Sequence, residues 1–136
     1  MTSSKKVTDR LFWVAMIGMG IYLLYAKGLI LANYESVSPK VAYEMIQNDD
    51  NLTLLDVRTP DEFNKEGRIA GAKLIPLYNL EGNLKMLDKS KQVLVYCHSG
   101  NRSVSASRIL SKNGYVVFNM SGGISSWKSE KLPVEN

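Results

Sequence analysis

The single cysteine of this chain, Cys97, stands at a position typical of a reactive thiol. It follows the apolar residues 93–96, which predict a buried strand, and it precedes a polar loop, residues 98–102, and a predicted helix that begins at Ser103. A strand–loop–helix unit directs backbone N–H groups and the positive end of the helix dipole into the loop, where they bind anions. A thiol held there is stabilised as the thiolate, the form that attacks electrophiles. The spacing therefore predicts a nucleophilic cysteine, whose sulfur must be ionised and open to solvent.

Length and composition limit what surrounds this thiol. At 136 residues the chain accommodates one modest domain. Residues 1–32 carry four basic residues and one acidic residue, whereas residues 33–136 carry 13 Lys or Arg and 12 Asp or Glu, so no clustered basic face indicates a nucleic-acid partner. A lone cysteine excludes an internal disulfide and an intramolecular resolving thiol. With one histidine and one cysteine, no zinc site is expected. No cofactor is expected either.

An apolar segment, residues 11–32, precedes the domain and contains one charge, Lys27. As a helix it would be roughly 33 Å long, enough to cross a hydrocarbon core of about 30 Å. A signal peptide has an apolar stretch of only about 7–15 residues and small residues before its cleavage site, whereas Leu24 and Ile30 stand two positions before the candidate alanines. We therefore expect a retained single-pass membrane anchor, with a cleaved signal peptide as the alternative.

The orientation of this anchor rests on the basic residues that flank it. Lys5, Lys6 and Arg10 precede the span, and Lys27 and Lys40 follow its apolar core. Because basic residues favour the cytoplasmic side, this bias places the basic tail, residues 1–10, inside. The domain that follows a linker, residues 33–37, is then expected on the extracytoplasmic side.

Residues 38–134 alternate between helix and strand patterns. Helices are expected over 41–47, 60–66, 103–112 and 123–129, a broken helical segment over 77–87, and strands over 52–57, 72–75, 92–96 and 115–118. Ser38 before Pro39 and the capping box of Thr59 with Glu62 mark two helix starts. Short continuous apolar strands alternating with helices predict an α/β fold, a mainly parallel sheet with helices on both faces. Ligands bind at the carboxyl ends of such strands, where Cys97 lies.

Four motifs in this part of the chain resemble the single-domain rhodanese family of sulfurtransferases, and they occur in the family's order. They are D-V-R at 56–58 with P-D-E-F at 60–63, G-R-I-A-G-A at 67–72 with I-P at 75–76, C-x-x-G-x-R-S at 97–103, and G-G at 122–123 with W at 127 and L-P at 132–133. The family often has histidine where this chain has Arg68. The resemblance covers residues 38–134 and leaves the amino-terminal span outside the family domain.

The resemblance implies a double displacement. The Cys97 thiolate takes a sulfane sulfur from a small anionic donor, thiosulfate or a persulfide, becomes a persulfide itself, and passes the sulfur to a thiol or to cyanide. The same N–H groups could stabilise the thiolate and the persulfide. Asp56 and Arg58 fall at the carboxyl end of a strand, where we expect an ion pair that supports the loops rather than a direct chemical role.

The remaining loop residues are expected to line the site. Arg102 is the best candidate for holding an anionic donor, because a guanidinium binds oxyanions through two N–H groups, and it could also pair with a carboxylate and hold the loop. Gly100 would permit a positive φ or a close approach. The ring of His98 is expected to point away from the sulfur. The other members of the loop are two lining residues and one expected helix cap, namely Ser99, Asn101 and Ser103.

Two other functions remain open. Cysteine-dependent phosphatases and arsenate reductases also place a cysteine and an arginine around an anion, but with five intervening residues, whereas four separate Cys97 from Arg102. The shorter loop suits a sulfur atom better than a tetrahedral phosphate or arsenate. A non-catalytic, membrane-tethered binding module is the other alternative, although such relatives usually lack the cysteine that this chain retains.

Overall fold

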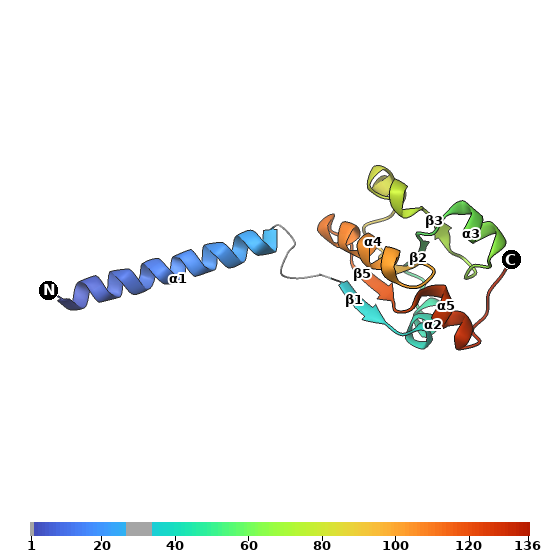
Figure 1. Ribbon diagram of the computed structural model, residues 1–136, viewed down its shortest axis with the longest axis horizontal. Helices are drawn as coiled ribbons and strands as arrows, with labels where there is room; N and C mark the ends of the chain where they lie inside the picture. The colour runs from blue at the N-terminus through green and yellow to red at the C-terminus, as the bar shows by residue number, and fades with distance from the viewer. Residues whose placement is uncertain (1, 27–33) are drawn as a thin grey trace. The chain divides into compact units, whose positions relative to one another are not determined.

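The computed structural model describes residues 2–26 and 34–136, and the chain divides into an amino-terminal helix and an α/β domain. Within residues 34–136 the domain is built on a five-stranded sheet in the order β1-β5-β4-β2-β3 (Figure 1). All of its neighbouring strands run parallel. The strands are β1 (Tyr34–Val37), β2 (Leu52–Asp56), β3 (Lys73–Leu74), β4 (Gln92–Tyr96) and β5 (Val117–Met120).

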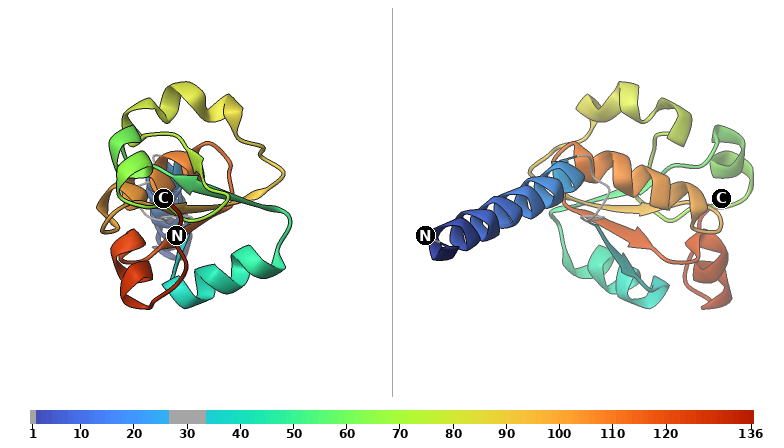
Figure 2. Two further views of the ribbon diagram at one scale, coloured as in Figure 1. Left: turned by 90° about the vertical axis from the view of Figure 1, so that its right-hand side faces the viewer. Right: turned by 60° about the vertical axis from the view of Figure 1, so that its left-hand side comes forward.

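Helices cover both faces of this sheet, as the sequence predicted (Figure 2). Helices α2 (Pro39–Asn48) and α5 (Gly123–Ser129) lie on one face. Helix α4 (Asn101–Lys112) and two 3₁₀ segments, η1 (Leu77–Asn79) and η2 (Glu81–Met86), lie on the other. The short helix α3 (Pro60–Lys65) follows β2. The expected α/β fold with a mainly parallel sheet is therefore confirmed.

Strand β4 shows how the sequence divides between the two faces. Its side chains alternate, so that Val93, Val95 and the following Cys97 belong to the core on the α4 side. Leu94 and Tyr96 belong to the core on the α2 and α5 side, together with Trp127 of α5. Because successive side chains of a strand point to opposite faces, this alternation directs Cys97 towards α4 and its preceding loop.

Two helix starts follow from local capping. The Ser38 hydroxyl accepts a hydrogen bond from the Val41 N–H at 3.3 Å, and Pro39 occupies the first turn of α2. At α3, the Thr59 hydroxyl accepts from the Glu62 N–H at 3.2 Å, and the Glu62 carboxylate accepts from the Thr59 N–H at 3.3 Å. This reciprocal pair is the expected capping box, and it fixes the position of the Glu62 side chain.

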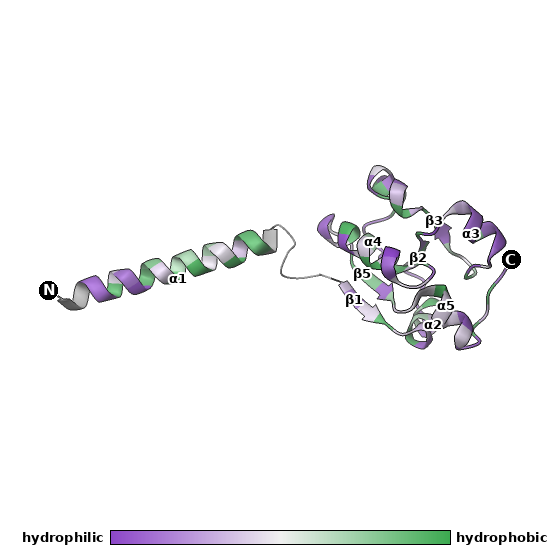
Figure 3. Ribbon diagram, in the orientation of Figure 1, coloured by the Kyte–Doolittle hydropathy of each residue, from purple (hydrophilic) through white to green (hydrophobic). Residues whose placement is uncertain are grey.

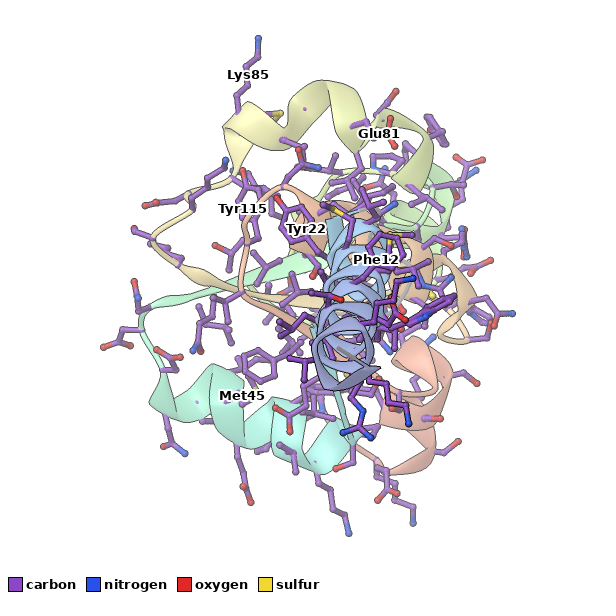
Figure 4. The ribbon with its side chains drawn as sticks, turned by 90° about the vertical axis from the view of Figure 1, so that its left-hand side faces the viewer. Phe12, Tyr22, Met45, Glu81, Lys85 and Tyr115 are labelled. Carbon is purple, nitrogen blue, oxygen red and sulfur yellow. The ribbon has the colours of Figure 1, made fainter. Side chains whose placement is uncertain are left out.

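Several boundaries differ from the sequence expectation. The segment expected as a linker, 33–37, contains strand β1, which pairs with β5 through the register Tyr34 with Val117. Strand β5 begins at Val117 rather than Tyr115, because Val117 is also the residue that pairs with Val93 of β4. The segment 77–87 forms 3₁₀ turns that break at Asn83 instead of an α-helix. Its Lys85 points away from the domain (Figure 4).

The amino-terminal helix α1 runs from Thr2 to Ala26, so residues 2–10, expected as a tail, continue the helix. Its segment Lys5–Leu24 is long and apolar enough to cross a membrane, with a mean hydropathy of 1.4. Apolar side chains such as Phe12 and Tyr22 are exposed on it (Figure 4), and the apolar residues follow a polar first part (Figure 3). One helix of this kind is a candidate span. Residues 27–32 of the expected span lie outside the described residues.

Candidate active site

The sulfur of Cys97 lies in a cradle of backbone N–H groups at the carboxyl end of β4. The N–H groups of Gly100 and Ser103 donate to Sγ at 3.1 Å and 3.3 Å. The thiol in turn lies 3.5 Å from the Ser103 hydroxyl, which can accept its proton. Gly100 has a φ of +105° and is the N-cap residue of α4, so the chain turns back over the sulfur there. The predicted strand–loop–helix anion cradle is present around this thiol.

Ser103 has a different role from the one expected. Helix α4 begins at Asn101 with Gly100 as its N-cap, so Ser103 lies inside the first turn and does not cap it. Its buried hydroxyl donates to the Gly100 carbonyl at 3.0 Å, while its N–H donates to the Cys97 sulfur. From inside the first turn of α4, Ser103 therefore binds both the Cys97 sulfur and the Gly100 carbonyl.

The start of α5 holds the same loop from the other side. The N–H groups of Ile124 and Ser125 donate to the carbonyls of Cys97 and His98 at 2.8 Å and 3.0 Å. This approach depends on Gly123, whose φ is +61° and at which a Cβ atom would stand 2.4 Å from the His98 carbonyl oxygen. The loop backbone is therefore fixed by direct contact with a glycine.

Arg102 pairs with Glu62 of α3. Its two terminal nitrogens donate to the two carboxylate oxygens at 2.6 Å and 2.8 Å. The hydrogen bond from Arg102 lowers the pKa of Glu62 to about 2, and the same bond raises the pKa of Arg102. Of the two roles considered for Arg102, this geometry shows the loop-holding one.

The thiol is closed off in this conformation. Cys97 is 0% exposed, whereas the sequence interpretation required a sulfur open to solvent. His98, Ser99 and Asn101 are exposed on the outside of the loop, and the side chain of Arg102 is 34% exposed. The sulfur is therefore enclosed in this conformation, and a donor reaches it only when the surrounding residues move.

Asp56 and Arg58 form the ion pair that the sequence predicted, and both side chains are fully buried. The Arg58 Nε donates to both carboxylate oxygens at 3.0 Å, and one terminal nitrogen donates to Asp56 at 2.7 Å and to the Gly67 carbonyl at 2.8 Å. Tyr96 lies beneath this pair, and burial followed by the Asp56 charge raises its pKa. The pair thus ties the end of β2 to the segment at Gly67.

Other candidate ligands lie outside the sulfur cradle. The side chains of His98, Glu62 and Glu66 bring one ligand atom each within 4.8 Å of one another. Both oxygens of Glu62 are already bonded to Arg102, so this group offers a cation at most two uncommitted ligands. A separate hollow of about 140 Å³ lies between α2, α5 and the carboxyl-terminal segment, lined by Tyr43, Ile69 and Trp127 among others. None of its lining residues belongs to the Cys97 loop.

Two residues of the site were not identified as functional from the sequence. In the sequence, Glu62 belongs to a capping box and to the P-D-E-F motif, and the capping box also predicts a carboxylate held in a fixed position. Gly123 was interpreted only as part of a motif, and the glycine pair at 122–123 was the signal of a close backbone approach. Both residues contact the loop from segments far away in the sequence, and local sequence patterns do not reveal such contacts.

Comparison with known proteins establishes the family. Residues 38–130 match the rhodanese-like domain family. The chain is 34% identical over 101 residues to a sulfurtransferase of Allochromatium vinosum, a match that covers 74% of this chain and 89% of that protein. It is 33% identical over 97 residues to the thiosulfate sulfurtransferase GlpE of Coxiella burnetii, covering 71% of this chain and 89% of that protein. The chain therefore belongs to the rhodanese-like domain family.

Solved structures agree with this assignment. A rhodanese-related protein from Thermoplasma volcanium superimposes with a TM-score of 0.70 and 38% sequence identity, covering 75% of this chain and 98% of that chain. A rhodanese-like domain protein from Staphylococcus aureus superimposes with a TM-score of 0.66 and 28% identity, covering 75% and 99%. The resemblance seen in the four sequence motifs is confirmed, and relatives at about 33% identity support membership of a sulfurtransferase family.

Proposed function

We propose that this protein is a membrane-anchored sulfurtransferase that carries sulfane sulfur on Cys97. The observation that carries the proposal is the pair of N–H groups, from Gly100 and Ser103, that donate to Sγ at 3.1 Å and 3.3 Å. These donors favour a negative charge on that sulfur. A sulfur atom added to the thiolate produces a persulfide anion that the same loop can hold.

The reaction has two balanced steps. In the first, the Cys97 thiolate attacks the outer sulfur of the donor, the Sγ–S bond forms and the donor's S–S bond breaks, so that thiosulfate leaves as sulfite and a persulfide leaves as a thiolate. In the second, cyanide or a thiolate attacks the outer sulfur of the Cys97 persulfide, and thiocyanate or a new persulfide leaves. Each step conserves charge and needs no outside oxidant or reductant.

Access to the sulfur requires the loop to open, because Cys97 is 0% exposed. The Arg102–Glu62 pair ties the loop to α3, so we expect this pair to break when the loop opens. Such local opening costs far less than unfolding the domain. A covered resting thiol is then protected from oxidation between turnovers.

The test is mass spectrometry of the full chain in detergent after incubation with thiosulfate. We expect an adduct of about 32 Da, one sulfur, which cyanide removes as thiocyanate. Because Cys97 is the only cysteine, Cys97→Ser must abolish both signals without changing the fold. Hydrolysis of a phosphate ester without sulfur transfer would instead support a phosphatase, and an unmodified thiol would support a binding module.

The anchor and its side of the membrane belong to the same proposal. Support for the anchor comes from the exposed apolar side chains of α1 and the span Lys5–Leu24. Strand β1 begins at Tyr34, level with Val93 of β4, so the chain enters the sheet at the end opposite to Cys97. We expect the protein to resist alkaline extraction from membranes. We also expect protease added outside intact cells to cut its domain. Protection from that protease would place the domain in the cytoplasm.

A further inference from the structure

The cation expected to bind an anionic donor is already neutralised. Arg102 is the only Lys or Arg among residues 97–103, and both of its terminal nitrogens donate to Glu62. Glu62 is held from behind by Thr59, whose N–H and hydroxyl donate to Oε1 at 3.3 Å and 3.1 Å. The carboxylate therefore stays against the guanidinium without a large entropic cost, and the pair presents no net charge to an incoming donor.

Other charged groups around the loop do not replace this cation. The Glu66 carboxylate lies beside Glu62 and His98, so it adds negative charge at the edge of the loop. Among the described residues, the basic side chains nearest in sequence to this cluster, Lys65 and Arg68, pair with Asp61 at 3.7 Å and Glu135 at 3.3 Å. Lys128 donates to the Glu66 backbone carbonyl at 2.6 Å, so its positive charge lies beside Glu66 and offsets the charge of that carboxylate. The entrance therefore carries no net positive charge that would attract a dianion more strongly than a monoanion.

We propose that Glu62 is a specificity-determining residue that acts through Arg102 and makes the protein select singly charged sulfane-sulfur donors, persulfides above all, over the thiosulfate dianion. This inference rests on the proposed sulfurtransferase function. A persulfide R–S–S⁻ gives its outer sulfur to the Cys97 thiolate and leaves as R–S⁻, so two negative charges enter and two remain. Thiosulfate brings one more negative charge to the same entrance, and that charge faces Glu62 and Glu66.

Electrostatic energy scales with the product of the charges, which makes the expected pattern quantitative. Removing the Glu62 charge should favour a dianion by about tenfold at this partly buried site. A monoanion should then gain only the square root of that factor, about threefold. A change in loop packing alone would instead affect both donors by the same factor.

The experiment compares Glu62→Gln with the unmodified full chain in a nonionic detergent, using thiosulfate (charge −2) and methanethiosulfonate (charge −1) as donors and cyanide as acceptor. We expect kcat/KM to rise about tenfold for thiosulfate and about threefold for methanethiosulfonate, mainly through KM. The conservative Glu62→Asp, which keeps the carboxylate, should stay near the original donor ratio. Glu44→Gln removes an exposed carboxylate of α2, outside the charged groups named above, and should leave both rates unchanged.

A second measurement needs no variant. Raising the ionic strength screens repulsion, so the thiosulfate-to-methanethiosulfonate rate ratio of the unmodified protein should increase between about 0.02 M and 0.2 M salt. The proposal is wrong if Glu62→Gln leaves the donor ratio unchanged, lowers both rates together, or if salt does not shift the ratio. If no donor places sulfur on Cys97, the proposed function itself fails, and the two failures are thereby distinguished.

Discussion

Gly123 supports the active loop through a contact that no other residue type allows. A Cβ atom at this position would lie 2.5 Å from the Cys97 carbonyl oxygen and 2.4 Å from that of His98. Those two carbonyls accept the hydrogen bonds from Ile124 and Ser125. We therefore predict that Gly123→Ala separates α5 from the loop and destabilises the domain.

The magnitude follows from two contributions. Alanine at a φ of +61° costs about 1–2 kcal/mol. Relieving the steric overlap requires the loop backbone to move, which weakens two hydrogen bonds worth about 1 kcal/mol each. We therefore expect a total loss of about 3–4 kcal/mol, a large part of the stability of a domain of this size. Gly71→Ala is the matched control, because Gly71 has a φ of +83° but a Cβ atom there would meet no other atom within 4 Å. It should lose only about 1–2 kcal/mol.

The assay is urea unfolding of the full chain in detergent, followed by the fluorescence of Trp127 in a Trp13→Phe background. These are the only two tryptophans, and Trp127 is buried, so it reports the domain alone. Alkylation of Cys97 gives a second readout, because the thiol is 0% exposed until the loop opens. Each 1.4 kcal/mol lost from the closed loop should accelerate alkylation about tenfold. The reasoning is refuted if Gly123→Ala is as stable as Gly71→Ala and its thiol reacts no faster.

Two further predictions concern buried and half-buried charges. Asp56→Asn leaves the fully buried Arg58 without its counter-ion and should lower the free energy of unfolding in urea by about 3–5 kcal/mol. The control Asp61→Asn changes an exposed carboxylate and should change that free energy by less than about 0.5 kcal/mol. Equal effects of the two substitutions would contradict a stabilising role for the Asp56–Arg58 pair. Glu62 has its pKa lowered from 4.5 to about 2 by Arg102, so its contribution to stability is present above pH 4.5 and lost as the pH falls towards 2. Because the Arg102 side chain is about a third exposed, solvent screening reduces that contribution to roughly 1 kcal/mol. In urea unfolding measured between pH 4.5 and about 2, Glu62→Gln should therefore lose about 1 kcal/mol less stability than the unmodified protein.

Much of this domain could be predicted from local sequence because its signals are local. The capping box of Thr59 and Glu62 and the proline after Ser38 mark helix starts within a few residues. The apolar run of β4 followed by a polar loop and a helix marks an anion cradle around Cys97. The family motifs occur along the chain in the order typical of the rhodanese family, and the match of residues 38–130 to the rhodanese-like domain family confirms this resemblance.

Strand boundaries depended on partners far away in the sequence. Strand β1 consists of four residues with a largely exposed pattern, so nothing in its own sequence distinguishes it from a linker. Its pairing with β5, some eighty positions later, makes it a strand. The apolar run that begins at Tyr115 likewise does not reveal which residues pair. Tyr115 instead directs its hydroxyl to the Leu84 carbonyl at 2.8 Å, and the neighbouring strands select Val117 as the first residue of β5.

The sequence by itself determined that one cysteine would sit among backbone N–H groups at the end of a parallel strand, because strand, loop and helix there are contiguous. It did not determine the state of that sulfur or the charge around it. Glu62 meets Arg102 across forty positions, and Gly123 meets the loop carbonyls from a later helix. Only tertiary packing brings such groups together, and it is this packing that buries Cys97 and neutralises its arginine.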